Sequence, residues 1–124
     1  MSCILVIDDE QRIAAFVSRA LRAHGLPSET VCSGEEAIAA IRGGRFSLVI
    51  LDLMMPREDG ATTFQRLRQR RPQLPILLCT GLPQPDPVPQ LLQAGGVRML
   101  RKPFRMNELW FAVKQSLTSA PAPP

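Results

Sequence analysis

Residues 47–52 read Ser47-Leu48-Val49-Ile50-Leu51-Asp52, four aliphatic side chains in a row that end in a carboxylate. An apolar run without polar alternation is typical of a parallel strand that is covered on both faces of its sheet. Such a strand delivers whatever follows it to one edge of the sheet. The stretch therefore predicts a buried parallel strand with Asp52 at its carboxyl end.

Comparable runs occur on both sides of this stretch and are separated by segments of helical periodicity. Strands are expected at Cys3 to Ile7, Ser28 to Cys32, Pro75 to Cys79 and Val97 to Leu100. Helices are expected up to His24-Gly25, from Ser33 to Gly43, from Gly60 to Arg71 and from Met106 to Leu117. Alternating strands and helices predict an α/β fold: a five-stranded parallel sheet between two helical layers.

The fourth of the five expected helices should be short. Prolines alternate at Pro83, Pro85, Pro87 and Pro89, where its first turns would lie. Asp86 can cap a helix that begins near Pro87, because a proline is tolerated in the first turn. We therefore expect a fourth helix shortened by prolines.

Length and composition favour a single soluble domain. The chain has 124 residues, 45% of them hydrophobic, and its longest wholly apolar stretch, Cys3 to Ile7, is far too short to cross a membrane. No export signal opens the sequence, so a cytoplasmic location is expected. We expect one domain over residues 1–118 and a Pro/Ala-rich tail or linker over residues 119–124.

Two other features have ordinary structural interpretations. Cys3, Cys32 and Cys79 lie in apolar runs without the spacing of a metal or redox site, so we expect buried thiols. The net charge of +4 includes a cluster of Arg66, Arg68, Arg70 and Arg71 that could contact nucleic acid. A solvated helix face is the favoured interpretation, because no aromatic residues are interleaved with the arginines.

Polar side chains follow four of the expected strands. Asp8, Asp9 and Glu10 follow the first, Asp52 the third, Thr80 the fourth, and Arg101 and Lys102 the fifth. Ligands of open parallel sheets bind at the carboxyl ends of the strands, where these groups should meet. Clustered carboxylates repel one another unless a cation offsets them, and oxygen ligands suit Mg²⁺ or Mn²⁺. The pattern predicts a divalent metal site at Asp8, Asp9 and Asp52.

A carboxylate in such a site can act as a nucleophile and accept a phosphoryl group. Asp52 is the candidate, because the adjacent pair Asp8-Asp9 can share the metal while Asp52 faces it alone. Phosphoryl transfer needs little from a protein beyond in-line positioning and neutralisation of charge on the phosphoryl oxygens. The ammonium group of Lys102 and the hydroxyl group of Thr80 can supply that neutralisation.

The chain resembles the receiver domain of two-component response regulators over residues 3–118. The resemblance rests on five motifs: Leu5-Val6-Ile7-Asp8-Asp9-Glu10, Leu51-Asp52-Leu53-Met54-Met55-Pro56 through Asp59-Gly60, Thr80, Ala94-Gly95-Gly96 and Lys102-Pro103-Phe104. It implies a flavodoxin-like three-layer sandwich with strand order 2-1-3-4-5. It also implies a phosphorylation-controlled signalling switch whose partners are a sensor histidine kinase or phosphotransfer protein and an effector.

The same resemblance implies a role for each site residue. Asp52 would be the phosphoacceptor, and Lys102 would pair with the phosphoryl group. Asp9 and Asp52 would bind Mg²⁺ through their side chains, Met54 through its backbone carbonyl and Asp8 through water. Thr80 would move toward the new phosphate oxygens as part of the switch.

The sequence departs from the family pattern at two places. Met99 stands three residues before Lys102, where an aromatic side chain usually follows the threonine inward; core packing is favoured over a substitute switch. Met54 and Leu82 flank the expected path of the attacking water with apolar side chains that cannot orient it. Slow loss of the phosphoryl group is therefore expected.

Three other functions compete with this interpretation. A degenerate receiver that binds proteins without phosphorylation is the main alternative, favoured by Met99 and the proline-rich fourth loop. An aspartyl phosphatase would need a D-x-D pattern, whereas Asp8 and Asp9 are adjacent. Nucleic-acid binding through Arg66 to Arg71 is not expected within this domain. The domain should be a monomer or a weak homodimer.

Overall fold

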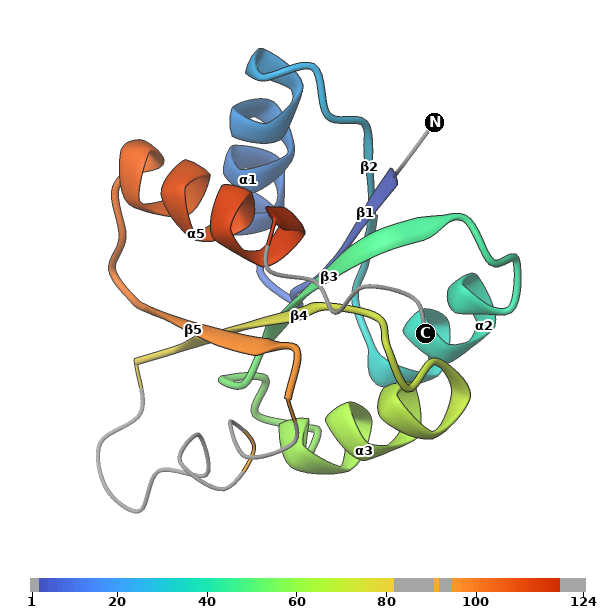
Figure 1. The fold of residues 1–124 in the computed structure, drawn as a ribbon. Coiled ribbons are helices and arrows are strands. Elements are labelled where there is room, and N and C mark those ends of the chain that lie inside the picture. Colours follow the sequence, from blue (N-terminus) through green and yellow to red (C-terminus); the bar gives the residue numbers. More distant parts are fainter. Residues whose placement is uncertain (1–2, 82–90, 92–94, 119–124) are drawn as a thin grey trace.

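The computed structural model describes residues 3–81, 91 and 95–118. In the described part of the chain, strands and helices alternate from β1 to β4, and β5 is followed by α5 (Figure 1). The elements are β1 (Cys3–Ile7), α1 (Gln11–Ala23), β2 (Ser28–Val31), α2 (Gly34–Ile41), β3 (Phe46–Asp52), α3 (Gly60–Arg70), β4 (Ile76–Thr80), β5 (Val97–Arg101) and α5 (Met106–Thr118). Within these residues, each helix is too short or too polar to cross a lipid bilayer.

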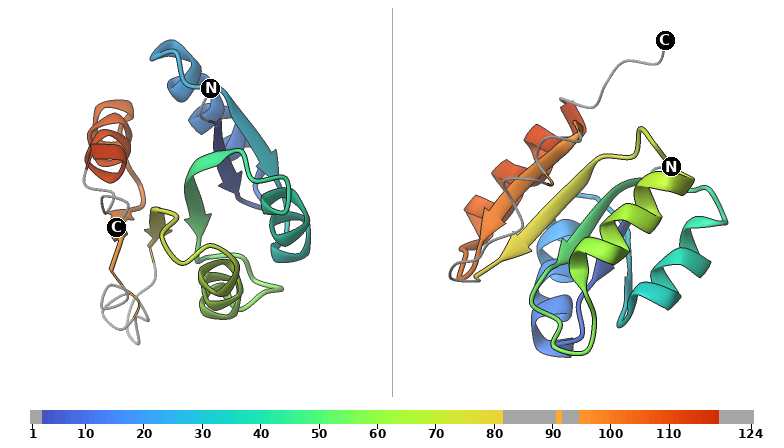
Figure 2. Two further views of the ribbon diagram at one scale, coloured as in Figure 1. Left: turned by 45° about the vertical axis from the view of Figure 1, so that its right-hand side comes forward. Right: turned by 90° about the horizontal axis from the view of Figure 1, so that it is seen from below.

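The five strands form one parallel sheet, as the sequence predicted, and their order β2-β1-β3-β4-β5 is the one that the resemblance to receiver domains implied. Helices α1 and α5 cover one face and α2 and α3 the other (Figures 1 and 2). The order reverses between β1 and β3, whose carboxyl ends therefore lie side by side in the middle of the sheet. The topology thus places Asp8 beside Asp52.

Each face of the sheet has its own apolar core, because successive strand residues point to opposite faces. Leu48 and Ile50 of β3 pack toward α1 and α5, whereas Val49 and Leu51 pack toward α2 and α3. Most of these strand side chains are fully buried. This double burial explains the uninterrupted aliphatic runs from which the strands were predicted.

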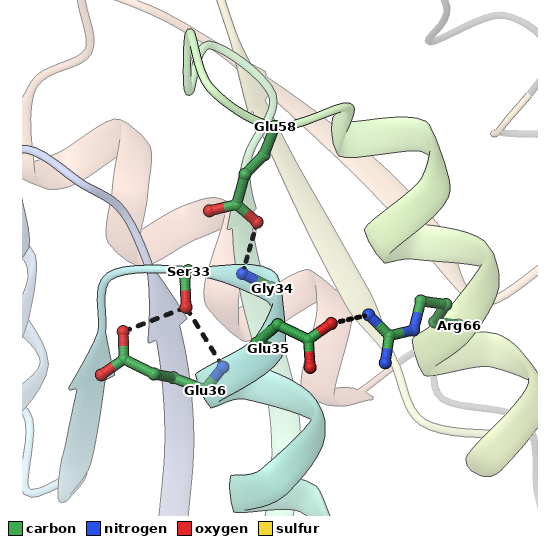
Figure 3. A network of polar contacts seen from close by, with 6 residues as sticks. All are labelled: Ser33, Gly34, Glu35, Glu36, Glu58 and Arg66. Carbon is green, nitrogen blue, oxygen red and sulfur yellow. Dashed lines mark hydrogen bonds and ion pairs between the residues drawn. The ribbon is translucent and has the colours of Figure 1, made fainter.

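The amino-terminal end of α2 is tied to the loop after β3 and to α3 (Figure 3). Ser33 caps α2 by accepting a hydrogen bond from the Glu36 backbone N–H at 3.2 Å. The Gly34 N–H donates to the Glu58 carboxylate at 2.6 Å. A Cβ atom on Gly34 would lie 2.5 Å from Thr63 Oγ1 and 2.8 Å from that carboxylate oxygen, so a larger residue would displace both side chains.

Several expectations can be compared with these elements. The shortened fourth helix with its start near Pro87 lies outside the described residues, as do Leu82 and the tail. The prediction of buried thiols is wrong for Cys32, which is exposed because β2 ends at Val31 and the chain turns into α2. It is confirmed for Cys79, whereas Cys3 is partly buried.

The arginine cluster is not a uniform solvated face. Arg66 forms an exposed ion pair with Glu35 at 2.7 Å. Arg68 instead folds back over the Phe64 ring and donates to backbone carbonyls that precede β4 and β5, among them Pro72 at 3.1 Å and Gly95 at 3.0 Å. Its guanidinium group therefore joins the loop before β4 to the loop before β5.

Replacing Arg68 with Met is expected to lower the free energy of unfolding by about 2 kcal/mol, because several carbonyls lose a charged donor while the apolar stem is kept. The matched control is Arg66→Met, which breaks only an exposed ion pair and should cost less than about 1 kcal/mol. Chemical denaturation of both variants measures the difference. Equal losses would contradict the structural role of Arg68.

Candidate functional site

Four strand ends bring the predicted site residues together at one edge of the sheet. Asp8 and Asp9 follow β1, while Asp52 and Thr80 are the last residues of β3 and β4. Lys102 follows β5, and its peptide bond to Pro103 is cis. Thr80 is fully buried, and its carbonyl accepts a hydrogen bond from the Lys102 N–H at 2.8 Å, which continues the β4–β5 pairing into the site.

Three carboxylates form the acidic part of the site. One oxygen from each of Asp8, Asp9 and Asp52 lies within 4.8 Å of the others. Asp8 is 5% exposed and Asp52 2% exposed, whereas Asp9 faces solvent. Three oxygen donors at this separation, one of them open to solvent, fit a hard divalent cation that keeps several water ligands.

Lys102 supplies the positive charge of the site. Its Nζ atom lies 3.1 Å from Asp52 Oδ1 and 3.7 Å from Asp8 Oδ2. Burial alone would lower the pKa of Lys102, but the neighbouring carboxylates of Asp52 and Asp8 more than offset burial and raise this pKa above its usual value. The side chain is therefore a fixed cation at neutral pH.

Asp8 has an unfavourable position for a charged carboxylate. Burial and the charge of Asp52 raise its pKa to about 6, although a hydrogen bond from the Glu10 N–H at 2.9 Å and the charge of Lys102 act in the opposite direction. One ammonium group does not neutralise two buried carboxylates. The site thus holds excess negative charge that a bound cation can offset.

The two methionines singled out in the sequence lie in different surroundings. The Met54 N–H donates to Asp52 Oδ1 at 2.8 Å, so the backbone of this residue touches the candidate phosphoacceptor. Met99 is partly buried and packs against the core on the α2 and α3 face. Packing of Met99 agrees with the interpretation favoured from the sequence.

Sequence reasoning missed two contacts near the site. The Gly81 N–H donates to the Met54 sulfur atom at 3.0 Å, and Phe16 of α1 lies 6.3 Å from Phe104 between ring centroids. These residues line a cavity of about 490 Å³ together with Ile13 and Lys102. Met54 and Phe104 belong to the motifs, whereas Phe16 and Gly81 do not, and no spacing rule joins positions this far apart in the chain.

The comparisons with known proteins agree with this geometry. Residues 4–114 match the family model described as response regulator receiver domain. The chain is 35% identical over 120 residues to transcriptional regulatory protein TcrA of Mycobacterium tuberculosis. This match covers 97% of the chain and 47% of that protein. It is 40% identical over 106 residues to the probable transcriptional regulatory protein TcrX of the same organism, over 86% of this chain and 45% of that one.

Solved structures show the same fold over almost the whole chain. Vibrio cholerae chemotaxis protein CheY4 matches with a TM-score of 0.86 at 29% identity, covering 94% of this chain and 99% of that one. The receiver domain of Brucella abortus NtrX matches with a TM-score of 0.84 at 28% identity, covering 94% and 98%. The chain spans less than half the length of the curated relatives TcrA and TcrX. On the family match and these likenesses, the chain belongs to the response regulator receiver domains, which are phosphoacceptor modules of two-component signal transduction.

Proposed function

We propose that Asp52 accepts a phosphoryl group in a reaction that requires Mg²⁺ or Mn²⁺, and that this modification switches the domain between two states. The observation that carries the proposal is the placement of Lys102 Nζ 3.1 Å from Asp52 Oδ1, beside three carboxylates that share one small volume. The site thereby combines a carboxylate nucleophile, oxygen ligands for a cation and the positive charge of Lys102.

In the proposed transfer, an oxygen of the Asp52 carboxylate attacks phosphorus and forms a carboxyl–phosphate bond. The bond from phosphorus to the donor breaks, and its electron pair leaves with the donor, where an imidazole nitrogen or a small acid is a suitable leaving group. Lys102 then pairs with the phosphoryl oxygens instead of the free carboxylate. The hydroxyl group of Thr80 donates to the same oxygens.

The chain's own residues fit the metal that this family uses. Asp9 and Asp52 would hold it through carboxylate oxygens, Met54 through its backbone carbonyl and Asp8 through water. When bound, the cation offsets negative charge on the carboxylates and on the transferred group. The raised pKa of Asp8 supports this assignment, because it reports a carboxylate whose charge lacks sufficient compensation in the protein alone.

Receiver domains receive their phosphoryl groups from histidine kinases or phosphotransfer proteins, and we propose such a partner here. An apolar rim formed by Ile13, Phe16 and Phe104 lines a cavity beside Lys102. Phe16 is 38% exposed. A partner helix that places a phosphohistidine over Asp52 would cover this apolar rim as it docks.

The output of the switch is proposed to pass through Thr80 to a separate effector, with residues 1–118 as the receiver and residues 119–124 as a tail or linker. The names of the relatives TcrA and TcrX suggest transcriptional control as one such output. Met99 favours a second candidate, a receiver that binds its partner without phosphorylation, because the usual aromatic switch residue is absent.

The first prediction concerns phosphorylation itself. With Mg²⁺ and a small phosphodonor such as acetyl phosphate, the protein should gain the mass of one phosphoryl group, and Asp52→Asn should not. Intact-protein mass spectrometry measures the change, and a chelator should abolish it. Unmodified wild-type protein under these conditions would favour the phosphorylation-independent binding module.

The second prediction concerns the lifetime of the phosphoryl group. Met54 is 39% exposed at the mouth of the site and offers no group that can orient an attacking water, so phosphorylated wild type should decay slowly. Met54→Asn introduces a polar amide there and should decay several-fold faster. Time courses of the phosphorylated mass test this. A wild type that decays faster than Met54→Asn would contradict the expectation.

The third prediction concerns the buried charge of Asp8. Its pKa is raised from 3.8 to about 6, so between these values the folded protein retains a proton that the unfolded chain releases. The stability that this residue contributes is therefore present at low pH and is lost as the pH rises through about 6. Without divalent cations, Asp8→Asn should raise the free energy of unfolding at neutral pH by on the order of 2 kcal/mol.

This gain should shrink as the pH falls toward the ordinary range of a carboxyl group, because wild-type Asp8 is then protonated too. Chemical denaturation at several pH values in the presence of a chelator provides the measurement. An Asp8→Asn variant less stable than wild type at neutral pH would show that the carboxylate is adequately compensated.

A further inference from the structure

The thioether sulfur of Met54 accepts a hydrogen bond from a backbone N–H group at the edge of the site. The Gly81 N–H donates to Met54 Sδ at 3.0 Å, across a gap of 27 residues in the chain. Gly81 is exposed and directly follows Thr80, the last residue of β4. The sulfur atom therefore covers a backbone donor that would otherwise be open to solvent or to a ligand.

The close approach depends on the absence of a side chain at Gly81. A Cβ atom there would lie 3.1 Å from Met54 Sδ, 3.4 Å from the Lys102 carbonyl oxygen and 3.5 Å from Lys102 Cβ. The separation from Met54 Sδ is tighter than an ordinary contact, whereas the two from Lys102 are ordinary, so a larger residue would displace the thioether from the amide. Gly81 thus packs between Met54 and Lys102.

Residue 54 is joined to the candidate phosphoacceptor as well. Its N–H donates to Asp52 Oδ1 at 2.8 Å, and the same Asp52 oxygen lies 3.1 Å from Lys102 Nζ. Met54, Gly81 and Lys102 also line one cavity. Gly81 therefore lines the same cavity as Lys102, whose ammonium group contacts Asp52.

A thioether is a weak hydrogen-bond acceptor, whereas a phosphoryl oxygen is charged and binds an N–H group strongly. A methionine side chain is also flexible enough to swing aside. We propose that Met54 is a positioning residue that caps the Gly81 N–H while Asp52 is unmodified and yields this donor to a phosphoryl oxygen after transfer. The inference rests on the proposed phosphorylation of Asp52.

Met54→Leu tests the cap, because leucine keeps the apolar bulk and removes the acceptor. Met106→Leu is the matched control: Met106 is similarly exposed, 45% against 39% for Met54, and begins α5. In protein without any phosphoryl group, NMR should show faster exchange of the Gly81 amide proton with water in Met54→Leu. The rate in Met106→Leu should equal that of wild type.

The release step is tested with beryllofluoride, a stable mimic of a phosphoryl group, in the presence of Mg²⁺. Loss of the competing sulfur contact should make Met54→Leu bind this mimic roughly two- to five-fold more tightly than wild type, while Met106→Leu should match wild type. Titrations followed by the Gly81 amide resonance give both the affinity and the change at the proposed donor.

The outcomes separate this inference from the proposed function. If wild type binds no beryllofluoride with Mg²⁺, the proposed phosphorylation of Asp52 fails, and the release of the donor fails with it. If wild type binds the mimic but Met54→Leu has the same affinity, the cap is overturned while the proposed function stands. An unchanged Gly81 exchange rate in Met54→Leu also overturns the cap.

Discussion

The ammonium group of Lys102 lies between two buried carboxylates, 3.1 Å from Asp52 and 3.7 Å from Asp8, and the chemistry of the site depends on this unequal pairing. One positive charge cannot satisfy both acids. Burial, together with the charge of Asp52, raises the pKa of Asp8 to about 6, and the excess negative charge favours binding of a further cation. Transfer of a phosphoryl group to Asp52 would then redistribute charge around Lys102, which is a physical basis for two distinct states.

The pairing exists only because the topology brings distant segments to one edge of the sheet. Right-handed crossovers between parallel strands return every strand in the same direction, so the carboxyl ends of β1, β3, β4 and β5 share that edge. Asp8 directly follows β1 and Asp52 ends β3, the two strands on either side of the reversal in strand order. The core that holds them consists of aliphatic side chains on both faces, which also removes water from Asp52.

The features of the fold and site that could be predicted from the sequence are those that depend on neighbouring residues in the chain. The strand Cys3–Ile7 was predicted with its observed bounds, because burial on both faces of the sheet requires consecutive apolar residues, which are visible in a short stretch of sequence. The acidic cluster followed from strand ends once a parallel sheet was assumed. Side-chain direction was not predictable. Arg68 folds onto backbone carbonyls and Cys32 faces solvent, and the residues next to them in the sequence indicate neither orientation. The contact from Gly81 to Met54 depends on two loops meeting, which periodicity cannot reveal.

Met54 shows how one position can serve the site in separable ways. Its N–H fixes an oxygen of Asp52, and its carbonyl is the expected backbone ligand of the cation; both belong to the main chain and do not depend on the identity of the side chain. The thioether alone contacts the Gly81 N–H, and Met54 lines the cavity beside Lys102. Substitutions at this position can therefore alter access to a donor and to water while the backbone contacts that place Asp52 stay the same. If Asp52 is phosphorylated as proposed, the side chain at position 54 can set the lifetime of the phosphoryl group while the main chain keeps the transfer chemistry unchanged.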